Sequence, residues 1–264
     1  MRKIYIYDIE LYLNLFLVIF KDIYTNQLYI FEISQRRDDR VALLKFIKEA
    51  EEMIGFNNLA FDYPLLHHFI LLFKKRLTGK QLVTELFNKG QQLINSNNRW
   101  ANIIRKPFVN QTDLFLINHY DNFAKSTNLK VLEFNMEMPT IQELPFRFDS
   151  ILAPEEIDIV IEYCKNDINA THKFFTHNVG AIEFRKRMSK TYNHDFTNYN
   201  DVKIGEQILL KEVSNGMNLQ TWDVKKMRTK REKMLMADII FDYVKFKTPE
   251  FKTLLNWWKE RTIT

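Results

Sequence analysis

Two acidic residues near the start of the chain stand two positions apart, in Asp8-Ile9-Glu10. In a β-strand, residues i and i+2 project to the same face, so the two carboxylates would lie side by side. Carboxylates in this position repel each other unless a cation lies between them. A pair of this kind also arises by chance in a chain of this length, and two solvent-facing acids on an edge strand remain the alternative.

A second group of polar and aromatic residues is Asn57, Phe61 and Asp62. Asp62 follows an expected strand and begins an expected helix. In sheets with parallel strands, ligands gather at the edge where the strands end, which makes Asp62 a candidate for the same site as the first pair. The alternative is an aspartate that only caps its helix.

A third pair, Tyr163 and Asp167, lies in the most clearly periodic helix of the chain. Residues at i and i+4 share a helix face, so the phenol and the carboxylate would be neighbours. Taken alone, this pair also fits the boundary of an amphipathic helix, with the tyrosine half-buried and the aspartate solvated.

Together the three motifs read D-x-E, N-x-x-x-F-D and Y-x-x-x-D, in this order and on the elements that each requires. In this respect residues 3–176 resemble the DEDD (DnaQ-like) superfamily of 3′-5′ exonucleases. They are most similar to the proofreading domains of family B and phage-type DNA polymerases. The histidine-containing branch of the superfamily has His five positions before the last aspartate, where this chain has Glu162. The resemblance is therefore to the tyrosine-containing branch.

The resemblance implies a two-metal-ion hydrolysis of phosphodiester bonds, with two Mg²⁺ or Mn²⁺ ions. By this resemblance the metal ligands are Asp8, Glu10, Asp62 and Asp167. Tyr163 would complete the catalytic group by orienting the attacking water, because a phenol of ordinary pKa near 10 is a poor base at neutral pH. Asn57 and Phe61 would bind the terminal nucleotide, with a purely structural role for both left open.

Three further residues lie near these motifs. Asp113 follows an expected strand. It is interpreted either as the cap of the next helix or as a residue that supports the site. Lys130 lies where related exonucleases have a similar Leu-Lys segment. It is interpreted either as a contact to a phosphate of the substrate or as an exposed surface lysine. Cys164 is expected to pack in the core.

The elements that must position these residues follow from the hydrophobic pattern. Strands are expected at 2–10, 13–21, 27–33, 53–56 and 108–113. Helices are expected at 38–52, 61–73, 154–175, 201–213, 221–236 and 249–261, with one more in 76–106 and short helical pieces near 114–120 and 129–134. This order predicts an α/β ribonuclease H-like fold, with a mixed five-stranded sheet flanked by helices and a C-terminal helical appendage.

Charge divides the chain unevenly. The chain has 38 Lys and Arg residues and 33 Asp and Glu residues. Residues 177–264 contain 17 of the basic and 11 of the acidic residues, so the basic excess lies in this last third. We expect an exonuclease domain at 1–178 and a basic helical appendage, or a linker to a further region, at 179–264. Such a segment suits a polyanion, although a solvated helical face explains the charge equally well.

The expected activity is removal of nucleotides from the 3′ end of single-stranded or frayed DNA, with release of nucleoside monophosphates. The expected partners are this DNA end and a DNA polymerase domain or other replication proteins. The single cysteine and the lack of a long apolar run or leader predict a cytoplasmic protein, in the host cytoplasm if a phage encodes it. An inactive nucleic-acid-binding or partner-binding module and an RNA-directed exonuclease of the same superfamily remain alternatives.

Overall fold

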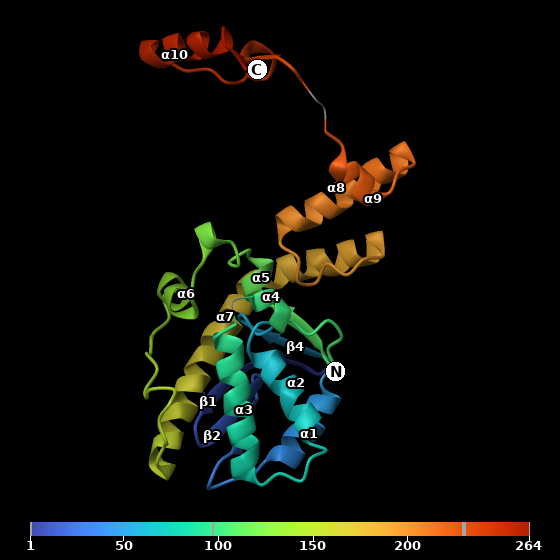
Figure 1. Ribbon diagram of the computed structural model, residues 1–264. Coiled ribbons are helices and arrows are strands. Elements are labelled where there is room, and N and C mark those ends of the chain that lie inside the picture. The colour runs from blue at the N-terminus through green and yellow to red at the C-terminus, as the bar shows by residue number, and fades with distance from the viewer. Residues whose placement is uncertain (1, 97, 229–230, 264) are drawn as a thin grey trace. The chain divides into compact units, whose positions relative to one another are not determined.

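A computed structural model describes residues 2–96, 98–228 and 231–263 of the chain (Figure 1). Its main sheet has five strands: β1 (Ile4–Tyr12), β2 (Leu15–Asp22), β3 (Leu28–Ile33), β4 (Glu52–Gly55) and β5 (Asn110–Asp113). The strand order is β3-β2-β1-β4-β5. β1 and β2 pair antiparallel, as do β2 and β3, whereas β4 runs parallel to both β1 and β5. The predicted α/β class and mixed five-stranded sheet are therefore confirmed.

Helices flank this sheet and follow it in the chain. They are α1 (Arg40–Glu49), α2 (Asp62–Leu72), α3 (Gly79–Ile94), α4 (Arg99–Asn102), α5 (Leu114–Ile117), α6 (Leu129–Asn135), α7 (Pro154–Tyr192), α8 (Asp201–Met217), α9 (Thr221–Lys226) and α10 (Pro249–Lys259). Two 3₁₀ turns, η1 (Phe123–Lys125) and η2 (Met236–Asp238), complete the helical elements. Each of these described helices is too short or too polar to span a lipid bilayer.

The alternation of side chains along β1 builds two separate cores, one on each face of the sheet. Tyr5, Tyr7 and Ile9 point into a core that residues of α1, α2 and α3 complete. Ile4 and Ile6 point the other way, into a core built with α7. Because successive side chains of a strand alternate between faces, Asp8 and Glu10 belong with Ile4 and Ile6. Both acids therefore face α7.

The helix α7 is longer than the sequence pattern predicts, since it continues past the expected end at Phe175 to Tyr192. Gly180 lies inside this helix, and no atom lies within 4 Å of the position that a Cβ would occupy there, so no close contact requires a glycine at this position. Beyond this glycine, Arg185 is 2% exposed and donates hydrogen bonds to the carbonyl oxygens of Ile117 at 3.1 Å and Tyr199 at 2.7 Å. These contacts tie the second half of α7 to the first part of the chain.

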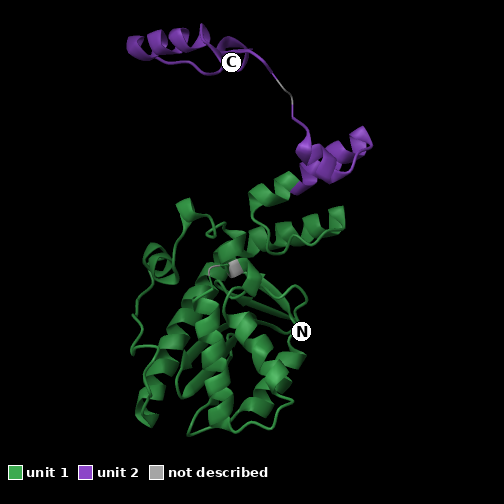
Figure 2. Ribbon diagram, in the orientation of Figure 1, with its two compact units in different colours: residues 1–206 green, residues 207–264 purple. Residues whose placement is uncertain are grey.

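The chain divides into two compact units, residues 1–206 and 207–264 (Figure 2). The predicted division at 178/179 falls within α7, which lies entirely in the first unit, where hydrogen bonds of Arg185 hold its second half. In the second unit, the helix predicted over 221–236 ends at Lys226. Lys and Arg dominate the sequence from Arg228 to Lys233, and like charges on one helix face oppose helix formation. Residues 229 and 230 of that prediction lie outside the described residues.

The second unit also contains a feature that the sequence pattern does not predict. β6 (Met234–Leu235) pairs antiparallel with β7 (Thr262–Ile263). This pairing joins the two ends of the segment that contains α10, so the unit is not purely helical.

Candidate active site

The first two predicted metal ligands, Asp8 and Glu10, lie in the middle of the central strand β1. Glu10 is 9% exposed, and Asp8 is partly buried. On the facing helix α7, the Cys164 thiol donates a long hydrogen bond to Asp8 Oδ2, with Sγ at 3.7 Å. The pair of acids predicted from the D-x-E spacing is thus enclosed between the sheet and α7.

Asp62 is the first residue of α2 and is 7% exposed. The loop that leads into it is held by Asp113, whose carboxylate accepts hydrogen bonds from the backbone N–H groups of Asn57 at 2.9 Å and Leu59 at 3.2 Å. Asp113 also caps α5 with its side chain. The capping role considered for Asp113 is confirmed, and the same carboxylate fixes the loop of Asp62 to the end of β5.

The same loop has a second anchor in Asn58, which is fully buried. Its Nδ2 donates to Gln111 Oε1 at 3.0 Å and to the Tyr7 hydroxyl at 3.2 Å. A Cβ at Gly55 would lie 2.6 Å from the Cβ of Asn58, so only glycine fits at the end of β4 without displacing this side chain. Asn57 has a φ of 64°, in the left-handed region that asparagine tolerates better than most residues.

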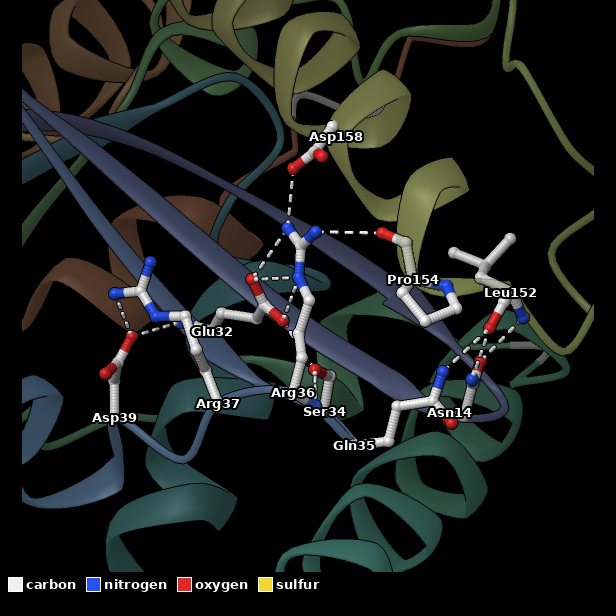
Figure 3. A network of polar contacts seen from close by, with 10 residues as sticks. All are labelled: Asn14, Glu32, Ser34, Gln35, Arg36, Arg37, Asp39, Leu152, Pro154 and Asp158. Atoms are coloured by element: carbon white, nitrogen blue, oxygen red, sulfur yellow. Dashed lines mark hydrogen bonds and ion pairs between the residues drawn. The ribbon is translucent and has the colours of Figure 1, made fainter.

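A polar network around Arg36 holds the start of α7 to the sheet (Figure 3). The guanidinium donates to the carbonyl oxygen of Pro154 at 2.8 Å and to Asp158 Oδ1 at 2.7 Å. It also pairs with Glu32, which is 0% exposed, at 2.9 Å. Two reciprocal 2.8 Å hydrogen bonds between Asn14 and the backbone of Leu152 hold the segment just before α7.

Tyr163 and Asp167 lie on the face of α7 that covers these acids, and they are 8% and 7% exposed. Lys130 of α6 approaches both of them. Its Nζ lies 2.5 Å from Asp167 Oδ1, 3.6 Å from Glu133 Oε1 and 4.7 Å from the centroid of the Tyr163 ring. Lys130 therefore supplies the positive charge beside the acids, and it is not simply exposed.

Burial raises the pKa of every carboxyl group in this cluster, and repulsion among the groups adds to the effect. Burial, followed by the charge of Asp167, raises the pKa of Asp8 to about 7. Burial likewise raises the pKa of Asp62 well above its usual range, with the charge of Asp8 as the next cause. The pKa of Asp167 is also raised by burial, and the hydrogen bond from Lys130 opposes this rise.

Glu10 is the acid whose pKa the charges of all three other acids affect. Burial raises its pKa well above the usual range, and the charges of Asp8, Asp167 and Asp62 raise it further. A single carboxyl group on β1 thus interacts with acids from β1, α2 and α7. The four predicted metal ligands lie in one electrostatically coupled cluster, although they are far apart in the sequence.

The phenol of Tyr163 remains protonated over the whole physiological range. Burial is the first cause of its raised pKa, and the charge of Asp167 is the second. Tyr163 can therefore position another group by hydrogen bonding, and it cannot serve as a base at neutral pH.

Asn57 and Phe61, the predicted nucleotide-binding residues, line one pocket of about 480 Å³. Its remaining lining residues are Ala60, Leu93, Ile94, Ser96 and Asn102. Phe61 also packs against the core under α2 and α3, so it has a structural contact in addition to its place at the pocket. A larger hollow of about 1250 Å³ lies along β5. None of the four acids lines either of these two cavities.

The donor set suits a hard divalent cation. Glu10 is 9% exposed, and among the described residues its carboxylate makes no hydrogen bond or ion pair with the chain, so its oxygens are open to solvent or to an ion. One ligand atom each from Asp8, Glu10 and Cys164 lies within 4.8 Å of the other two. Asp62 and Asp167 are not part of this closest group, and Asp167 is held by Lys130. Carboxylate oxygens in this arrangement fit Mg²⁺ or Mn²⁺.

In comparisons with known proteins, no protein-family model, curated protein or solved structure matches the chain. Sequence reasoning gave too little weight to two residues at the site. The only signal for Lys130 was its place in a resembling segment, and Cys164 was expected only to pack. Cys164, a residue of α7, does pack in the core, and its thiol also contacts Asp8.

Proposed function

We propose that residues 1–206 form a divalent-metal-dependent 3′-5′ exonuclease of the tyrosine-containing DnaQ-like type, with a ribonuclease H-like fold. The observation that supports this function best is the convergence of Asp8, Glu10, Asp62 and Asp167 beside the phenol of Tyr163. The strand order and directions of the sheet are compatible with that fold. No structural role for four coupled and buried acids is apparent, because their repulsion opposes folding.

Asp8, Glu10, Asp62 and Asp167 would hold two Mg²⁺ or Mn²⁺ ions, which supply a nucleophilic hydroxide at neutral pH and stabilise the leaving 3′-oxygen. Tyr163 orients the attacking water through its hydroxyl, which stays protonated. To bind a metal ion, Asp167 would have to exchange its contact with Lys130 for a contact with the ion, or keep both contacts. The pocket of Asn57 and Phe61 accepts the terminal base, with the aromatic ring available for stacking.

The proposed substrate is a single-stranded or frayed 3′ end of DNA, and the proposed products are nucleoside monophosphates. A proofreading role beside a DNA polymerase domain or other replication proteins of a phage would place the protein in the host cytoplasm. An RNA substrate is a second candidate, because two-metal chemistry at the phosphate does not require a particular sugar. A binding module without activity is the alternative from another functional class.

The test uses the full chain with DNA and RNA oligonucleotides that carry a label at the 5′ end. With Mg²⁺ or Mn²⁺ we expect a ladder that shortens from the 3′ end, with no activity in chelator. Asp8→Ala and Asp167→Ala should abolish it, whereas Glu162→Ala, which removes an exposed acid from the same helix α7, should retain it. Preferential degradation of RNA would reassign the substrate, and binding without degradation would support the binding module.

A further inference from the structure

Cys164 places a thiol among the acids of the candidate site. Its Sγ lies 3.7 Å from Asp8 Oδ2, and it belongs with Asp8 and Glu10 to the group whose ligand atoms lie within 4.8 Å of one another. A second observation is independent of the thiol. Glu10 as a residue is 9% exposed, one of its carboxylate oxygens belongs to this group, and the carboxylate has no hydrogen bond or ion pair within the described part of the chain.

The distance between the thiol and the carboxylate suits a particular class of ion. In a tetrahedral site with bonds of about 2.3 Å to sulfur and about 2.0–2.2 Å to oxygen, the sulfur and oxygen atoms stand about 3.6 Å apart. The observed 3.7 Å separation therefore requires little movement. Mg²⁺ and Mn²⁺ prefer oxygen ligands, whereas thiolate ligands favour Zn²⁺ and softer ions.

We propose that Asp8, Glu10 and Cys164 form a binding site for a thiophilic divalent ion such as Zn²⁺ or Cd²⁺. Cys164 itself is 0% exposed, and the neighbouring Asp8 is partly exposed to solvent. On binding, the S–H bond is replaced by a sulfur–metal bond, and the proton passes to solvent without any change of oxidation state. The three protein ligands leave a fourth tetrahedral position for water.

This site overlaps the one proposed for hard cations, because both use Asp8 and Glu10. A thiophilic ion held by the sulfur would occupy the shared carboxylates and exclude the second arrangement. The consequence for activity rests on the proposed function: micromolar Zn²⁺ should block the Mg²⁺-dependent exonuclease. Metal binding itself does not depend on that function.

The binding experiment uses the absorption spectrum of the full chain titrated with Cd²⁺ and with Co²⁺. The chain has a single cysteine, so any thiolate-to-metal charge-transfer band must come from Cys164. We expect a band that saturates at one ion per chain, disappears in Cys164→Ala and Cys164→Ser, and requires more metal in Asp8→Asn. The wild-type titration is decisive even if a variant folds poorly: a spectrum without the band overturns the proposal.

The activity experiment compares inhibition by Zn²⁺ in wild type and Cys164→Ser at a fixed Mg²⁺ concentration, each relative to its own activity without Zn²⁺. We expect the variant to need at least ~10-fold more Zn²⁺ for half inhibition, which corresponds to about 1.4 kcal/mol of lost binding free energy. Equal sensitivity of wild type and Cys164→Ser to Zn²⁺ would overturn the proposed competition between the two metal ions. If wild type has no Mg²⁺-dependent activity but shows the charge-transfer band, the proposed function fails and the metal site stands.

Discussion

Lys130 of α6 and Asp167 of α7 form an ion pair, with Nζ 2.5 Å from Oδ1, across 37 positions of sequence. The positive charge of the Lys130 ammonium group offsets part of the negative charge of the acids. It also opposes the rise in the pKa of Asp167 that burial causes. The pair thus explains how four coupled carboxyl groups are accommodated in one site before any metal binds.

Lys130→Met should destabilise the metal-free protein, because Asp167 loses its hydrogen-bonded partner in a largely buried position. For a charge-assisted hydrogen bond of this kind we expect a loss of about 1–3 kcal/mol in the free energy of unfolding at pH 7.5. The measurement is urea denaturation in chelator. Lys165→Met is the matched control, since it removes an exposed i,i+3 pair with Glu162 and should cost less than about 0.5 kcal/mol. Equal losses in the two variants would contradict this role of Lys130.

Tyr163→Phe should lower kcat by about 10²-fold, the loss that misplacing a reactant by about 1 Å can cause, while the fold stays intact. The hydroxyl is the only group removed, and it lies beside Asp167. Single-turnover degradation of an oligonucleotide measures the effect. Tyr29→Phe removes a phenol on β3 that bonds only to Gln27 among the contacts described, and it should retain full activity. Wild-type turnover in Tyr163→Phe would refute the proposed role.

The metal-free protein should lose stability as the pH rises from 4 to 8. The pKa of Asp8 is about 7 in the folded protein against an ordinary 3.8. Because this pKa is higher in the folded than in the unfolded protein, the stability that the Asp8 carboxyl group contributes is complete below pH 3.8. It is lost as the pH rises through 7. With about 1.4 kcal/mol for each pH unit of difference, this group contributes at most about 4 kcal/mol.

The measurement for this pH dependence is the urea midpoint in chelator, compared between wild type and Asp8→Asn. The difference between the two isolates the carboxyl group from the rest of the chain. Mg²⁺ should restore stability at pH 8, because it binds the deprotonated acids. If the wild type gains stability relative to Asp8→Asn between pH 5 and pH 8 in chelator, the coupling described for the site is wrong.

Arg36→Ala should weaken both stability and activity, although Arg36 contacts none of the four acids among its described hydrogen bonds. It leaves the fully buried Glu32 without its ion pair and frees the start of α7 from the sheet. We expect a loss of about 2–4 kcal/mol in the free energy of unfolding, somewhat below the range for breaking a fully buried pair because Arg36 is partly exposed.

The neighbouring Arg37→Ala is the control for Arg36→Ala, because Arg37 pairs with Asp39 at the surface. It should change stability by less than about 1 kcal/mol. Thermal unfolding and exonuclease assays on both variants give the comparison. A lower kcat in Arg36→Ala at a temperature where the variant is fully folded would show that the position of α7 matters for the chemistry.

The sequence alone determined the local geometry of the site. A strand period of two places Asp8 and Glu10 on one face, and a helix period of 3.6 places Tyr163 beside Asp167. The same periods predicted the α/β class and the mixed five-stranded sheet. These features follow from neighbours along the chain, where backbone geometry leaves few choices.

Only the tertiary structure decided which distant residues meet. The approach of Lys130 to Asp167, the contact of Cys164 with Asp8 and the anchoring of α7 by Arg36 depend on how helices pack on the sheet. No local period encodes these contacts, because a helix can rotate or shift by one residue without changing its own hydrogen bonds. The extension of α7 beyond Gly180 has the same origin: buried contacts of Arg185 outweigh the weak local preference of one glycine.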